Sequence, residues 1–258
     1  MKVLKVETEA FTASFRYPRV QVGRLPTFDM PPPATIYGHI AGALGEWFDP
    51  KGLDFAYTFT SAGKAVDLET GQPIERGPGK NSLRKQGWDF PVNVICSPNP
   101  QRREFLLRPR LTLYLRGSED VLERLGNAFL NPEFASVLGR SQDLAMCRAV
   151  TMMEARESPD VFFSHTLLPY DWRPWVLPGV SVLMPAFINY AANREALNSR
   201  YLQITWPPLR LFSDSTDTIS RERLPEAFVA DDSETREFSG RALPRGLCFH
   251  SLGPESAA

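Results

Sequence analysis

The sequence predicts an α+β fold: a ferredoxin-like (RRM-like) N-terminal domain with a protruding β-hairpin thumb, followed by a smaller β-rich C-terminal part. The first observation behind this prediction is the order strand, helix, strands, helix, strand along the first 156 residues, which a ferredoxin-like domain requires. The second is a long turn-rich stretch between two strands, which is typical of a hairpin that stands off a core. We therefore assign residues 1–165 to the ferredoxin-like domain, about 57–107 to the thumb, and 166–258 to the β-rich part with an acidic tail.

Hydrophobic spacing predicts the individual elements. The chain begins with alternating apolar and polar residues in KVLKVETEAFTASFRY, as a half-buried strand does. The segment PTFDMPPPATIYGHIAGALGEWF (26–48) then places three prolines before a helix, where their fixed φ is compatible with the first turn. The remaining predictions are a helix over about 34–47, a strand at 110–115, a helix at 118–130 and a returning strand at 144–156.

Three glycines, Gly38, Gly42 and Gly45, form a face of their own on the predicted first helix. Each glycine inside a helix costs about 0.8–1 kcal/mol relative to alanine. Two explanations stay open at this point. The helix either packs tightly against its own sheet, or something outside the chain comes close to this face.

Composition and cysteine usage exclude several classes of protein. The chain is 43% hydrophobic and 23% charged, as soluble globular domains are, and it has no apolar run long enough to span a membrane. Its three cysteines share no CxxC spacing, and its three histidines form no metal-binding pattern. The start of the chain has no apolar signal-peptide core. We expect a reduced, cytoplasmic protein that uses no metal and no cofactor and binds no membrane.

The near-neutral net charge of −1 hides two charged regions. Residues 76–116 contain nine Lys/Arg against two acids, whereas residues 214–237 contain eight acids against three arginines. The two regions are either solvated surfaces that pair with each other or separate functional surfaces.

Two short segments carry candidate binding residues. In SFRYPRVQVGR (14–24), Arg16, Arg19 and Arg24 alternate with aromatic rings, a mixture that suits single-stranded RNA, although a loop with solvated arginines has the same pattern. In LGRSQDLA (138–145), a glycine is followed by hydrogen-bond donors that either hold phosphates or close the turn.

A catalytic alternative rests on Tyr37 and His39. A tyrosine and a histidine near basic residues can act as general acid and base in metal-independent RNA cleavage. The alternative is a partly buried histidine in a helix with no catalytic partner. A third hypothesis is a protein-interaction domain with no role in RNA binding.

Taken together, ASFR at the end of the first strand, the basic loop, PTFDMPPPATIYGHIAGALG, the basic hairpin and GRSQDL resemble the Cas five family. This family comprises RAMP-type subunits of type I CRISPR surveillance complexes (Cascade). The resemblance is strong over residues 1–48, weaker over 105–155 and weakest in the C-terminal third. It implies a non-catalytic subunit that binds the 5′ handle of the CRISPR RNA (crRNA). It also implies that the subunit caps the backbone of Cas seven subunits beside the large subunit, so that the assembled complex can engage target DNA.

The resemblance further implies which residues bind the RNA, and one branch of the family implies a different activity. In type I-C systems the family member itself cleaves the precursor RNA with a Tyr, Lys and His set. This chain has Tyr37 but no matching Lys-His pair, so a type I-B-like, non-catalytic subunit is expected. The expected RNA-binding residues are Arg16, Arg19, Arg24, Tyr37, His39, Lys80, Arg84, Lys85, Arg108, Arg110, Arg140, Ser141 and Gln142.

Overall fold

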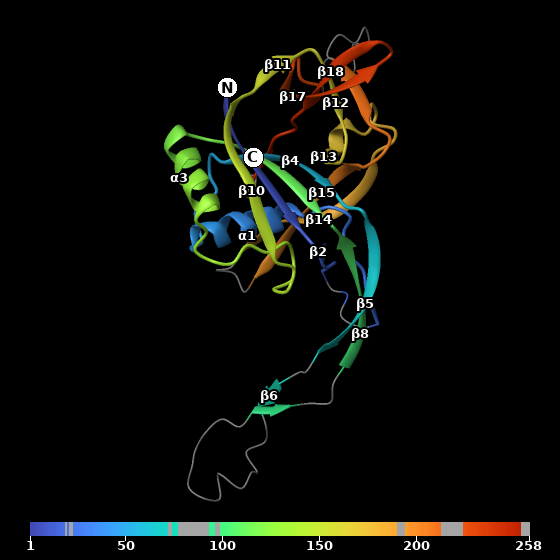
Figure 1. Ribbon diagram of the computed structural model, residues 1–258. Coiled ribbons are helices and arrows are strands. Elements are labelled where there is room, and N and C mark those ends of the chain that lie inside the picture. The colour runs from blue at the N-terminus through green and yellow to red at the C-terminus, as the bar shows by residue number, and fades with distance from the viewer. Residues whose placement is uncertain are drawn as a thin grey trace, which may run out of the picture.

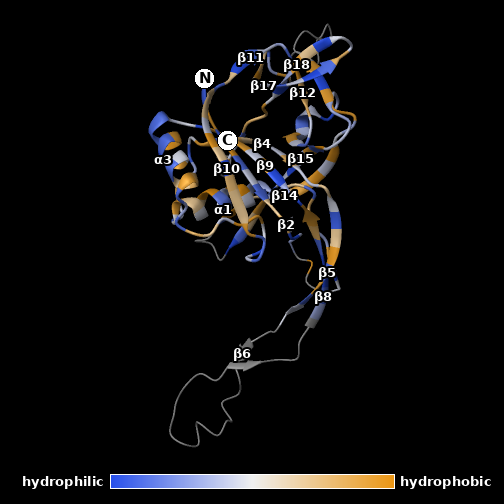
Figure 2. Ribbon diagram, in the orientation of Figure 1, coloured by the Kyte–Doolittle hydropathy of each residue, from blue (hydrophilic) through white to orange (hydrophobic). Residues whose placement is uncertain are grey.

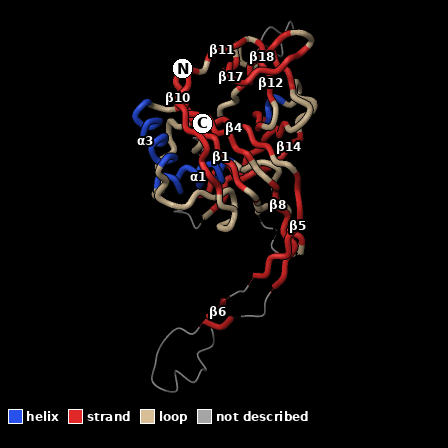
Figure 3. The backbone as a smooth tube through the Cα atoms, viewed as in Figure 1, coloured by secondary structure: helices blue, strands red, loops and turns tan. Residues whose placement is uncertain are grey.

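The predicted α+β class is confirmed in a computed structural model, which describes residues 1–18, 20, 23–71, 74–76, 93–95, 99–189, 194–212 and 224–253. Strands make up most of this part of the chain, and two α-helices lie on one side (Figure 3). Across the described ranges, none of the helices combines the length and apolar character needed to cross a membrane.

The central sheet has the ferredoxin-like topology. Its strand order is β10-β1-β9-β4-β19, with antiparallel neighbours throughout. The elements follow each other along the chain as β1-α1-β4-β9-α3-β10. If these four strands are counted from one to four in chain order, their order in the sheet is 4-1-3-2, and each helix connects two parallel strands. The elements are β1 (Lys2–Ala10), α1 (Pro33–Leu44), β4 (Asp54–Thr60), β9 (Arg110–Arg116), α3 (Glu119–Leu130), β10 (Ala145–Glu154) and β19 (His250–Ser251).

The main hydrophobic core lies between this sheet and the two helices. Alternate residues of β1, such as Leu4 and Val6, are buried there against Ile40 of α1 and Leu122 of α3. Hydrophobic and hydrophilic residues both occur along α3 (Figure 2), and its buried face consists of Leu122, Leu125, Gly126 and Phe129. Apolar residues that recur about every 3.6 positions in the helices and every second position in the strands therefore form this core.

The first helix ends earlier than the sequence predicts. It closes at Leu44, and Gly45 follows in the left-handed conformation with a φ of 78°. The Gly45 N–H donates to the carbonyl of Ala41 over 2.9 Å, which is a usual way to end a helix. Only Gly38 and Gly42 therefore lie inside the helix, and Gly45 is its C-terminal cap.

A protruding hairpin, predicted from the turn-rich stretch, is present between β4 and β9. It is built from β5 and β8, which pair antiparallel and extend away from the rest of the chain (Figure 1). Two short strands attach at its base, and a further strand pair continues it. The strands are β2 (Thr12–Ala13), β3 (Arg24–Leu25), β5 (Gly63–Gly71), β6 (Ile74–Arg76), β7 (Asn93–Ile95) and β8 (Asn99–Leu107).

The C-terminal segment forms two further sheets, with orders β11-β17-β18-β12-β16 and β13-β15-β14. On the side of the central sheet away from the helices, Val3 and Tyr114 pack with Leu247. On the helix side, Phe187 of β14 contacts the ring of Tyr37 in α1 at a centroid distance of 5.3 Å. The elements are β11 (Arg156–Ser158), β12 (Asp160–Phe163), β13 (Thr166–Pro169), the 3-10 helix η1 (Tyr170–Trp172), β14 (Val180–Asn189), β15 (Glu195–Ile204), β16 (Leu209–Phe212), β17 (Phe228–Phe238) and β18 (Arg241–Gly246).

Candidate nucleic-acid interface

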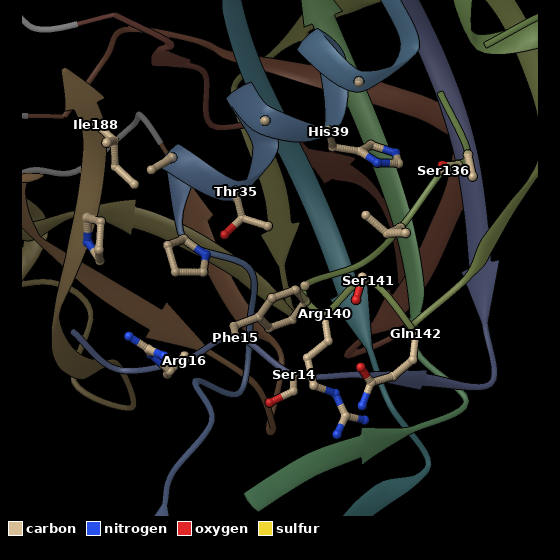
Figure 4. A pocket seen from close by; sticks show the side chains of 18 of the residues that line it. Ser14, Phe15, Arg16, Thr35, His39, Ser136, Arg140, Ser141, Gln142 and Ile188 are labelled. Atoms are coloured by element: carbon tan, nitrogen blue, oxygen red, sulfur yellow. The ribbon is translucent and has the colours of Figure 1, made fainter. Parts of the chain in front are cut away.

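A cleft of about 650 Å³ lies beside α1. Its lining comes from the strand-end residues 14–16, one face of α1, the segment 135–142 and the end of β14, with Glu69 and Arg103 contributed by the hairpin. We call it the α1 cleft. Thr35 and His39 extend from α1, while Arg140, Ser141 and Gln142 lie below the helix in the view of Figure 4. The fold thus brings together several predicted site residues that are far apart in the sequence.

The turn that carries GRSQDL is closed by a glycine and a buried carboxylate. Gly139 has a φ of +107°, and a Cβ at this position would overlap the backbone oxygen of Ser14. Asp143 is fully buried and accepts hydrogen bonds from the Arg140 guanidinium, with both Nε and Nη2 at 2.9 Å, and from the Thr12 hydroxyl at 2.6 Å. The turn requires glycine at position 139, and both oxygens of the Asp143 carboxylate accept hydrogen bonds. These two features together determine the shape of the turn.

Arg140 acts mainly inside this turn. Its side chain is only 10% exposed, and its charge is compensated by Asp143. Burial raises the pKa of Asp143, but the hydrogen bonds from Arg140 and Thr12 outweigh burial, and the pKa ends below its usual value. Ser141 and Gln142 remain exposed at the cleft. Of the three donors in this turn, the two neutral ones are therefore free to face a ligand.

The basic loop after the first strand divides into core and surface residues. Arg16 is exposed at the α1 cleft, and within the described residues it makes no ion pair. The rings expected to stack on RNA do not stand free: Phe15 is in the core, and Tyr17 stacks on Phe28 with centroids 3.8 Å apart. Arg24 pairs with Glu104 at 2.6 Å and so ties the loop to the base of the hairpin.

Tyr37 and His39 are not brought together. The Tyr37 ring is buried, and its hydroxyl donates to the carbonyl of Phe48 over 2.8 Å, whereas His39 lines the α1 cleft. Burial lowers the pKa of His39 to about 4, against a smaller opposing contribution from the backbone of Val137. The imidazole is consequently neutral at pH 7.

The remaining predicted residues lie elsewhere. Arg108 and Arg110 are exposed at the base of the hairpin, outside the α1 cleft. Arg108 has a φ of +46°, and its backbone N–H donates to the carbonyl of Phe11. The predicted residues Arg19, Lys80, Arg84 and Lys85 fall outside the described residues.

Sequence reasoning missed several residues of the cleft. Pro185 and Ile188 reach it from β14, and no local signal in the sequence links that strand to α1. Asp143, which supports the cleft from behind its lining, belongs to the GRSQDL motif, and its position three residues after Arg140 is the signal in the sequence for their ion pair. In the described ranges, His, Cys, Asp and Glu side chains form no group of three or more that could hold a metal ion.

Comparison with known proteins finds no matching protein-family model and no matching curated protein. Among solved structures, the chain is similar to a "CRISPR RNA-guided surveillance complex" chain, with 16% sequence identity, a TM-score of 0.49, and coverage of 81% of this chain and 91% of that chain. It is also similar to a CRISPR protein from Archaeoglobus fulgidus, with 14% identity, a TM-score of 0.41, and coverage of 96% and 100%. A chain of the type III-B Cmr-beta complex bound to cognate target RNA shows 8% identity and a TM-score of 0.44, with coverage of 81% and 86%.

Proposed function

We propose that this chain is the Cas five-type subunit of a type I-B-like CRISPR surveillance complex. In this role it binds the 5′ handle of the crRNA in the α1 cleft and caps the Cas seven backbone next to the large subunit. It performs no chemistry itself, and it supports recognition of target DNA by the assembled complex.

One observation carries the proposal. Two segments that carry the resemblance to the family, PTFDMPPPATIYGHIAGALG and GRSQDL, contribute residues to the same cleft although they are far apart in the sequence. The core of the fold does not require this, because Arg16, Ser141 and Gln142 are exposed and contribute nothing to the buried apolar clusters. A shared ligand at the cleft explains why both segments have their particular residues.

The polar groups of the cleft suit single-stranded RNA. Arg16 can contact a phosphate, and the side chains of Thr35, Ser141 and Gln142 can form hydrogen bonds with sugars or base edges. The sheet face away from the helices, which RRM domains use for RNA, is less suitable here. It carries the acidic side chains of Glu7, which is exposed, and Glu9, which pairs with Arg148.

The second candidate function is metal-independent cleavage of precursor crRNA. His39 lines the cleft, which is the observation in its favour, but its pKa of about 4 makes it a weak base, and the hydroxyl of Tyr37 is engaged with Phe48. Incubation of labelled repeat RNA with the protein in EDTA distinguishes the two functions. The proposal expects no specific cleavage, and cleavage that disappears in His39→Ala would support the nuclease.

Salt-dependent binding tests the RNA-binding proposal. The probe is a labelled single-stranded RNA with the CRISPR repeat sequence of the genome that encodes this chain. We expect Arg16→Ala to reduce the slope of log K against log salt by roughly 0.7. The double variant Arg16→Ala with Arg19→Ala should reduce it by up to about 1.4. The reason is that fewer counterions are released on RNA binding when the protein makes fewer phosphate contacts. Thermal melting should be nearly unchanged, since exposed arginines contribute little to stability.

The matched control is Arg156→Ala, which removes an 80% exposed arginine outside the α1 cleft. It should keep the wild-type slope and affinity. If Arg16→Ala behaves like Arg156→Ala, Arg16 is solvated surface, and the RNA site lies elsewhere on the chain.

A further inference from the structure

The fold of the chain itself does not require the two interior glycines of α1. Among the described residues, a Cβ built at Gly38 or at Gly42 would meet no atom within 4 Å apart from its chain neighbours and the nearby backbone of α1. At Gly139, by contrast, a Cβ would overlap the backbone of Ser14. Glycine is less favourable than alanine inside a helix, so an internal reason should appear as an atom that the added Cβ would meet, and none does among the described residues.

Both glycines belong to the helix face that lines the α1 cleft. Gly38 and Gly42 are four residues apart, so they stack along one side of the helix, next to Thr35 and His39. The opposite wall is the segment 135–142, which includes the closed GRSQDL turn. The absence of side chains at Gly38 and Gly42 allows a ligand in the cleft to approach the helix closely, beside the Gly42 carbonyl, which accepts a hydrogen bond from the N–H of Phe134 over 3.2 Å.

A second observation points to a polar ligand in the same place. His39 is 8% exposed and the Arg140 side chain 10% exposed, and both line the cleft. Within the described residues, Nε2 of His39 and Nη1 of Arg140 are buried without a hydrogen-bond partner. Such groups are nearly always paired in folded proteins, so a polar partner from outside the chain, water or ligand, is expected beside these nitrogens.

We propose that the sugar–phosphate backbone of the bound RNA lies directly against the Gly38/Gly42 face of α1, with the GRSQDL turn on its other side. This inference rests on the proposed RNA-binding function. A protein partner is less suited to the cleft. The exposed side chains of the walls, Arg16, Ser141 and Gln142, are a cation and two hydrogen-bonding groups, which suit the oxygens of a sugar–phosphate backbone. Any side chain at the glycine positions would move the RNA backbone away from the helix and from these donors.

The test substitutes alanine for each glycine in the full-length chain and measures melting and RNA affinity together. Gly38→Ala and Gly42→Ala should each raise the melting temperature by about 2–4 °C, because alanine favours the helix and the added Cβ meets nothing. Each should weaken binding of the labelled repeat RNA roughly tenfold, because the added methyl group lies where the RNA backbone packs. A higher melting temperature together with weaker RNA binding is the result that distinguishes RNA packed against the glycine face.

The control is Gly126→Ala in α3, where a Cβ would make an ordinary contact at 3.5 Å with Leu4. It should raise the melting temperature similarly and leave RNA affinity at the wild-type value.

Four results would contradict either this inference or the proposed function. Unchanged affinity in Gly38→Ala and Gly42→Ala, with wild-type binding intact, overturns this inference alone. A lower melting temperature overturns it too, because the glycines would then be needed internally. Normal RNA binding with lost capture of a partner subunit assigns the face to a protein instead. If the wild-type chain does not bind the RNA, the proposed function itself fails.

Discussion

Replacing Asp231 with alanine is expected to lower the free energy of unfolding by about 3–5 kcal/mol. The Asp231 carboxylate is fully buried and accepts hydrogen bonds from Lys5 Nζ at 2.8 Å and from the Tyr114 hydroxyl at 3.0 Å. Lys5 is itself only 12% exposed, so the substitution leaves a nearly buried ammonium without its main partner. The group joins β1 and β9 of the central sheet to β17 of the C-terminal sheet, and equilibrium unfolding in urea measures the loss.

The neighbouring residue provides a matched control. Asp232 is 55% exposed and lies 3.8 Å from Arg156, so Asp232→Ala should change stability by less than about 0.5 kcal/mol. Equal effects of the two substitutions would show that the buried ion pair does not join the two sheets in the way described.

Stability should also depend on pH through Asp231. Burial raises the pKa of Asp231, but hydrogen bonds from Lys5 and Ser233 outweigh burial and leave the pKa below its usual value of about 3.9. A carboxyl group whose pKa is lower in the folded state stabilises the fold above its unfolded pKa, and this stabilisation is lost as the pH falls through the folded value. The wild-type protein should therefore lose stability steeply below about pH 4, and Asp231→Ala should lose less over the same range.

Replacing Asp143 with alanine should have an effect of similar size, about 3–5 kcal/mol, for a related reason. The substitution leaves the buried Arg140 guanidinium unpaired and removes the acceptor of the Thr12 hydroxyl. Unlike Asp231, Asp143 holds the turn at the α1 cleft, so RNA affinity should fall even under conditions where the variant is folded. Urea unfolding and binding of the labelled repeat RNA at low temperature measure the two effects separately.

Two further variants make the Asp143 result specific. Asp143→Asn keeps an oxygen acceptor without the charge and should fall between wild type and Asp143→Ala in stability. Gln142→Ala, at an exposed neighbour, should leave stability within about 0.5 kcal/mol of wild type. A Gln142→Ala variant as unstable as Asp143→Ala would mean that the whole turn, and not the buried carboxylate, determines the effect.

The sequence was sufficient to predict the fold class and the order of strands and helices in the ferredoxin-like part, because these depend on local periodicity. It did not predict that β19, near the C-terminus, joins the central sheet beside β4. Apolar residues alternate in the strand that carries Leu4 and Val6, and they recur at helical spacing in α1 and α3. The end of α1 was predicted too late. Apolar residues continue at helical spacing past Gly45, and the local signal for a cap competes with that pattern.

Long-range pairs are the part that the sequence could not supply. Lys5 and Asp231 are 226 positions apart, and no local pattern indicates that they meet. The same holds for Pro185 and Ile188 at the cleft. The alternation of arginines with aromatic residues was a correct local observation, but Phe15 is buried in the core, and of the two described arginines in this loop Arg16 faces the cleft and Arg24 does not.

The most direct test of the central claim, that RNA lies in the α1 cleft, is ultraviolet crosslinking of the bound repeat RNA followed by mass spectrometry of the crosslinked peptides. We expect crosslinks in the segments that form the walls of the cleft, 14–16, 32–42 and 135–142. Arg16→Ala and Gly42→Ala should reduce the yield of these crosslinks. Crosslinks confined to the sheet face around Glu7, or to the C-terminal sheets, would contradict it.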